Sequence, residues 1–122
     1  MGKEELFEAV LRVGDDAFLT HDSVLALHEL ALVNPRRVRV GTPHRARPKL
    51  PPFVEVMRQE LESAELTEYE GIPSATVARA LMDCRTMVMT DRLIEATRES
   101  AKRGLVRKRD VQRILAELGV RE

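Results

Sequence analysis

The sequence predicts an α+β fold: two N-terminal helices, a small, mostly antiparallel sheet of about three strands, and three C-terminal helices packed on it. Apolar residues recur with the helical period up to residue 32 and again after residue 76. The stretch between alternates with the period of a strand and contains all six prolines. Helices kept apart from strands indicate α+β. At 122 residues, the chain is predicted to be a single domain over residues 1–122.

Two helices are predicted in the N-terminal part. The first covers residues 3–13 and ends at Gly14. The apolar face predicted for it consists of Leu6, Phe7, Val10 and Leu11. The second covers residues 21–32, with Thr20 as its N-cap and Pro35 beyond its end.

Three strands are predicted next, at residues 37–40, 53–57 and 66–69, from alternation and β-branched residues. Residues 41–52 hold several prolines and are predicted to be a loop. For residues 59–65 the pattern leaves a helical turn and a strand extension open.

The C-terminal part is predicted to be helical. One helix covers residues 77–88 after the N-cap Thr76, and another covers residues 91–103 after the N-cap Thr90. The last covers residues 108–118 and has the clearest amphipathic spacing.

Composition bounds the class of protein. The hydrophobic fraction is 43%, the charged fraction is 33%, and the formal net charge is zero. We therefore expect a folded cytoplasmic protein without general attraction to nucleic acid. The single cysteine excludes an internal disulfide, and no apolar run is long enough to cross a membrane. No cofactor and no metal site are expected, since no cofactor motif or metal-ligand spacing is found.

The most informative segment is Tyr69–Asp83, where a Gly-Ile-Pro sequence precedes a predicted helix that carries Arg79 and Asp83. It resembles a signature in the C-terminal part of AbiEi-type antitoxins, the antitoxin component of type IV toxin–antitoxin systems. Further segments resemble the same family in the same order, so that the likeness covers roughly residues 15–118. They are residues 19–30, 35–43, 54–58 and 103–106. Val77 and Ala80 stand where the family often has Pro and Thr.

The resemblance implies a non-enzymatic regulator that neutralises a cognate nucleotidyltransferase-like toxin and contributes to autoregulation of its operon. Such antitoxins are generally thought to act without a stable complex with the toxin. The family usually begins with a winged-helix DNA-binding domain, and this sequence starts about where that domain would end. We therefore expect an excised domain or a short homologue. It is expected to bind DNA weakly and not to bind a membrane.

A block of cations is the predicted partner- or nucleic-acid-binding surface. Residues 36–49 contain six basic residues and no acid, while residues 60–70 contain five acids and no base. The six are Arg36, Arg37, Arg39, Arg45, Arg47 and Lys49. Such residues can bind phosphates or carboxylates. The alternative is a solvated edge that the acidic block neutralises. Changing Arg36, Arg37 and Arg39 to Glu is predicted to abolish function without unfolding the domain.

Arg79 and Asp83 are four residues apart on one helix face and are predicted to be a structural polar node. No catalytic residue is predicted, because no serine or cysteine has a base at catalytic spacing. Cys84 is expected to be an inert core thiol, and His21 is expected to assist the cap at Thr20.

Two other functions stay open. One is a stand-alone DNA-binding transcriptional module, which predicts operator binding that falls steeply with salt. The other is an accessory domain of an endonuclease-type protein, since similar segments can precede very-short-patch-repair-like nuclease domains in longer proteins.

Overall fold

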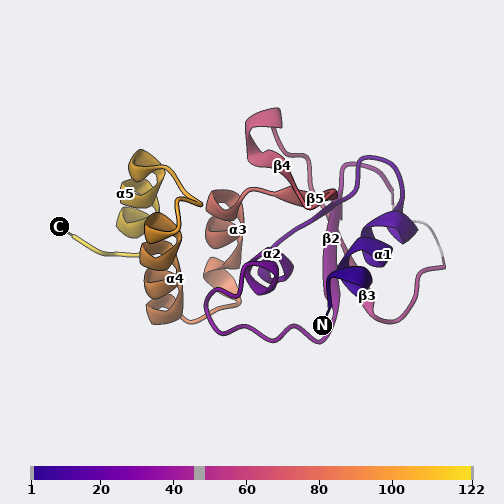
Figure 1. The fold of residues 1–122 in the computed structure, drawn as a ribbon, viewed down its shortest axis with the longest axis horizontal. Coiled ribbons are helices and arrows are strands. Elements are labelled where there is room, and N and C mark those ends of the chain that lie inside the picture. Colours follow the sequence, from indigo (N-terminus) through magenta and orange to yellow (C-terminus); the bar gives the residue numbers. More distant parts are fainter. Residues whose placement is uncertain (1, 46–48, 122) are drawn as a thin grey trace.

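The computed structural model describes residues 2–45 and 49–121. Its helices are α1 (Lys3–Val13), α2 (Asp22–Leu27), α3 (Val77–Asp83), α4 (Thr90–Lys102) and α5 (Lys108–Glu117). Its strands are β1 (Phe18–Leu19), β2 (Val38–Thr42), β3 (Val54–Arg58), β4 (Leu66–Tyr69) and β5 (Ile72–Ala75). Figure 1 shows their arrangement. The α+β class is as predicted, but the predicted sheet is wrong.

Within the described residues the sheet is mixed and has five strands, in the order β3-β2-β1-β5-β4. The β2–β3 and β1–β5 pairs are parallel, whereas β1–β2 and β4–β5 are antiparallel. Two of the five strands were not predicted from the sequence. The first, β1, has only two residues and is too short to show alternation. The second, β5, contains Pro73, which counts against a strand in sequence-based interpretation.

The β4–β5 hairpin closes with a two-residue turn. Tyr69 pairs with Ile72, and both residues between them, Glu70 and Gly71, have positive φ angles of 49° and 83°. Two consecutive positive φ angles define a type I′ turn, whose twist matches that of the flanking strands. The Gly-Ile-Pro sequence therefore leads into β5, a strand that was not predicted.

The three C-terminal helices were predicted to pack on the sheet, but their principal contacts are with other helices. The principal contacts place α1 against β2 and β5, and α2 against β2. In turn, α3 packs on α2, while α4 and α5 pack on α3 and on each other. Figure 1 shows this succession, from α1 on one side of the sheet through α2 and α3 to α4 and α5. The described part thus has its sheet layer and its C-terminal helices joined through α2.

The second helix ends earlier than predicted because it closes with a Schellman motif. The N–H of Leu30 donates to the carbonyl of Leu25, and the N–H of Glu29 donates to that of Ala26. Glu29 takes the left-handed position that glycine usually occupies, with a φ of 54°. Apolar periodicity continues through this reversal, so the sequence alone suggests a longer helix. Similarly, α3 gives way to a 3₁₀ turn after Asp83.

Candidate functional site

The six predicted basic residues do not form one exposed surface, because the Arg39 side chain is directed into the fold. Its Nη1 lies 2.6 Å from Asp22 Oδ2, and its Nε lies 2.9 Å from Glu55 Oε2. Its side chain is 26% exposed. The hydrogen bond with Asp22 raises the pKa of Arg39 further. Arg39 therefore joins α2 to β2 and β3 and is not free to bind a partner.

The remaining predicted cations differ in position. Arg37 is exposed, and its Nε donates to the carbonyl of Pro52 at 3.0 Å. Arg36, Arg45 and Lys49 are exposed. Arg47 lies outside the described residues. The triple change to Glu predicted from the sequence would thus not be benign, because at position 39 it would gather three carboxylates where one cation now binds two.

The predicted polar node of Arg79 and Asp83 is present and larger than expected. Arg79 Nε donates to Asp83 Oδ1 at 3.0 Å, and Arg79 Nη1 donates to Glu65 Oε2 at 3.0 Å. Gln59 Nε2 donates to the other Asp83 oxygen at 3.0 Å. The Asp83 side chain is 12% exposed. The hydrogen bond from Arg79 is the main reason why the pKa of Glu65 lies below its ordinary value.

The network continues from Gln59 to the start of α2. Thr20 Oγ1 donates to Gln59 Oε1 at 2.5 Å, and it lies 2.9 Å from His21 Nδ1. Because the Asp83 carboxylate requires the amide NH₂ of Gln59, its Oε1 must be the acceptor for Thr20. The hydroxyl has one proton, so Thr20 accepts from a protonated His21 Nδ1. We call these six residues the node network: Glu65, Arg79, Asp83, Gln59, Thr20 and His21.

His21 is the strained member of the node network. Its φ is 53° and its ψ is −134°, a region that residues other than glycine rarely occupy. Thr20 was predicted to be the N-cap of α2, but His21 takes that position and no side chain caps the helix. Burial lowers the pKa of His21, although Asp83 acts in the opposite direction. The imidazole is therefore neutral at neutral pH and serves as a hydrogen-bond donor.

Gly41 creates the space for this network. A Cβ at this position would lie 2.4 Å from Phe18 Cε2 and 2.9 Å from Gln59 Oε1. The Gln59 side chain crosses β2 at Gly41 to reach Thr20, so a larger residue would displace the amide. The sequence marked Arg79 and Asp83, but it carried no signal for Gln59, which falls in the segment where no element could be assigned.

Beside the node lies a charged groove, which we call the α3–α5 groove. It has a volume of about 730 Å³ and lies between the 3₁₀ turn Ser63–Glu65, α3 and α5. Arg79 and Asp83 line it, together with Met82, Leu105 and Val106. Five arginines and four acids line it in all: Arg79, Arg85, Arg107, Arg109, Arg113, Glu62, Glu65, Asp83 and Asp110.

Two of these arginines differ from the others. Arg79, Arg85 and Arg113 each form an ion pair with an acid. Among the described residues no ion pair joins Arg107 or Arg109, and both side chains are exposed. They belong to the start of α5, where positive charge is unfavourable for the helix dipole. This pair is therefore available to bind carboxylates or phosphates.

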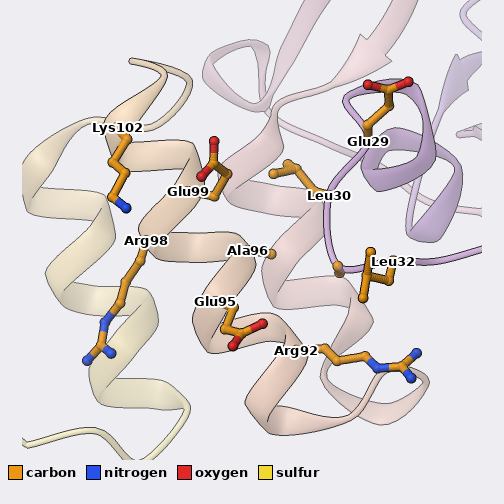
Figure 2. Close-up of a pocket in the computed structure, with 10 residues that line it drawn as sticks. Glu29, Leu30, Leu32, Arg92, Glu95, Ala96, Arg98, Glu99 and Lys102 are labelled. Carbon is orange, nitrogen blue, oxygen red and sulfur yellow. The ribbon is translucent and has the colours of Figure 1, made fainter.

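A second groove, of about 450 Å³, separates the loop after α2 from α4, and Figure 2 shows its lining. Leu30 and Leu32 come from the loop, while Arg92, Glu95 and Glu99 come from α4 (Figure 2). The loop is fastened by another side chain, because Arg103 Nη1 donates to the carbonyl of His28 at 2.6 Å. Its rim mixes both signs of charge, so the groove has no clear preference for a charged ligand.

Cys84 and His28, which could be reactive elsewhere, have structural roles here. Cys84 is buried, and burial raises the pKa of its thiol to about 12, so it is not a nucleophile near neutral pH. The His28 ring packs edge-on against the Tyr69 ring, with 4.8 Å between centroids. No helix in residues 2–45 and 49–121 is long and apolar enough to span a membrane.

Comparison of the chain with protein-family models, with curated proteins and with solved structures found no match. The function is therefore inferred from the sequence segments described above and from the geometry of the node network and the adjoining groove.

Proposed function

We propose that this chain is an antitoxin-like regulatory protein that neutralises a nucleotidyltransferase-like toxin. The ordered resemblance to AbiEi-type antitoxins supports the class. One observation carries the proposal furthest: Arg79 and Asp83, the charged pair of the Tyr69–Asp83 segment, bind each other and their neighbours within this chain. A signature whose charges are used internally specifies an architecture, as a non-enzymatic regulator requires.

We place the neutralising surface in the α3–α5 groove. It directly adjoins the Tyr69–Asp83 segment through Thr76, Arg79 and Asp83. It also exposes Arg107 and Arg109 above the apolar side chains that line it. A concave surface with apolar contacts and available guanidinium groups suits an acidic protein surface. The predicted basic surface retains exposed cations, but Arg39 is paired with Asp22 and Glu55 inside the fold.

Growth rescue tests the proposed function. A nucleotidyltransferase-like toxin is expressed in cells with and without this chain, the first choice being one encoded next to it, and growth is followed. Rescue by the folded chain is the expected result, and no stable complex is required for it. Absence of rescue by well-folded chain contradicts the proposal. An operator-binding titration over a range of salt concentrations would then test the DNA-binding alternative.

A further inference from the structure

A third groove, which we call the α1–β4 groove, gathers exposed apolar side chains. Its volume is about 590 Å³, and it lies between α1 and the β4–β5 hairpin. Of the six large apolar side chains exposed among the described residues, Phe7, Leu11 and Leu66 line it. They are 43%, 61% and 40% exposed. The sequence placed Phe7 and Leu11 on the core face of the first helix, but nothing in the described fold covers them. Exposed apolar residues that gather in a groove mark an interaction surface.

The strand beside this groove is an open edge of the sheet. Tyr69 closes the two-residue hairpin, and the N–H of Thr76 donates to the carbonyl of Glu65 at 2.9 Å. Alternate residues of an antiparallel strand direct their backbone groups to opposite sides. The backbone groups at 65, 67 and 69 therefore face β5, while those of Leu66 and Glu68 point away from it. The N–H of Leu66 already donates to the carbonyl of Ser63 in the 3₁₀ turn. Both residues are exposed, so the C=O of Leu66 and the N–H and C=O of Glu68 can pair with another strand.

The charge of this region selects the partner. Among the described residues, the groove is lined by Asp15 and Asp16 and by no basic residue. Asp16 pairs with His44, whose Nε2 lies 2.8 Å from Asp16 Oδ2. On β4 itself, Glu68 is exposed and has no basic partner among the described residues. A strand added here would therefore meet apolar side chains beside the carboxylates of Asp15, Asp16 and Glu68.

We propose that the free edge of β4 and the α1–β4 groove bind an extended segment of a partner protein that carries apolar and basic side chains. Its backbone pairs with the C=O of Leu66 and with the N–H and C=O of Glu68. Its apolar side chains contact Phe7 and Leu11, and its cations lie beside the carboxylates of Asp15, Asp16 and Glu68. Main-chain pairing supplies affinity in this mode of recognition, and the side-chain pockets supply specificity. This surface is distinct from the α3–α5 groove, and the proposal does not depend on the antitoxin function.

Amide hydrogen exchange of the whole chain tests this assignment with a capped seven-residue peptide of alternating valine and lysine. We expect saturable binding that protects the amide of Glu68, which exchanges rapidly in the free protein. A valine–glutamate peptide controls for charge, and a valine–lysine peptide with alternate N-methylated amides controls for backbone pairing. Both controls should bind at least about tenfold more weakly.

Two variants locate the site. Glu68→Pro removes an outward N–H that the fold does not use and should weaken binding about tenfold, whereas Glu68→Ala keeps that N–H. Leu11→Glu changes an exposed side chain and provides an independent loss if the proline variant does not fold. Binding without protection of the Glu68 amide overturns the proposal, as does equal binding of the glutamate peptide. Protection that grows with protein concentration in the absence of peptide identifies a second copy as the occupant and also overturns it.

Discussion

At the scale of single residues, the node network illustrates how one polar side chain depends on the next. Asp83 can accept from both Arg79 and Gln59 only because Gly41 leaves room for the amide. Thr20 then completes the chain of hydrogen bonds to His21. Removal of one member leaves buried donors unpaired, which costs more free energy than loss of an exposed pair.

Two single substitutions should separate the partly buried Arg79–Asp83 pair from an exposed pair. Asp83→Ala is expected to lower the free energy of unfolding by about 1–3 kcal/mol, because Arg79 and Gln59 lose their common acceptor. The matched control is Glu8→Ala, which breaks the Glu8–Arg12 pair at the same spacing on the surface. That loss should be about 0.5 kcal/mol or less. Urea denaturation measures both, and equal losses would refute the structural role assigned to the node.

Gly41→Ala tests the close packing at β2. The added Cβ would meet the Phe18 ring and the Gln59 amide, so we expect a loss of about 1–3 kcal/mol in the free energy of unfolding. Gly2→Ala is the control, since its Cβ meets nothing within 4 Å, and its effect should be smaller. A Gly41→Ala protein as stable as the wild type would show that Gln59 does not occupy this space.

Histidine titration should make the fold less stable in mild acid. Burial lowers the pKa of both His21 and His28 below 6.5. Well above pH 6.5 both histidines are neutral in the native and in the unfolded state, so their titration does not reduce the free energy of unfolding. As the pH falls through this value, the unfolded chain binds protons that the native state excludes. The free energy of unfolding should therefore decrease as the pH falls below 6.5.

The double variant His21→Asn, His28→Gln should flatten that decrease. Asn tolerates a positive φ and can donate in place of His21 Nδ1. Urea titrations at a series of pH values provide the measurement. If the variant kept the slope of the wild type, other groups would be responsible for it.

At the scale of elements, short segments decided where sequence-based prediction failed. The α1 helix, β3, β4 and the last two helices were predicted close to their observed bounds. Thr76 does cap α3, accepting from the N–H of Arg79, but α3 ends five residues before its predicted end. Thr90, the predicted cap of α4, is instead the first residue of that helix. The two-residue β1 was missed because it is too short to show alternation, and β5 was missed because Pro73 counts against a strand. For the site, the sequence indicated that Arg79 and Asp83 share a helix face. It did not reveal that Arg39 pairs with Asp22 and Glu55 inside the fold.

The end of α2 offers a prediction at this scale. Glu29 occupies a left-handed position that glycine adopts without steric cost. Glu29→Gly should therefore raise the free energy of unfolding by about 0.5–1 kcal/mol. Glu95→Gly, at an exposed position inside α4, should lower it by about 1 kcal/mol. Thermal unfolding compares the two, and a loss in both proteins would argue against the Schellman motif.

At the scale of the whole molecule, the described fold separates two kinds of surface. The α3–α5 groove offers unpaired arginines, while the α1–β4 groove offers carboxylates and apolar side chains around an open strand. The zero net charge of the chain conceals this division. A regulator that contacts more than one partner can use such opposite surfaces without competition between them.

The most direct test of the central claim is growth rescue by two charge-reversal variants beside the wild type. The groove variant carries Arg107→Glu and Arg109→Glu. The loop variant carries Arg36→Glu, Arg45→Glu and Lys49→Glu, and it leaves Arg39 in place. All five side chains are exposed, so both proteins should fold, which circular dichroism can verify. We expect the groove variant to lose rescue and the loop variant to retain it. Full rescue by the folded groove variant would rule out the α3–α5 groove as the neutralising surface.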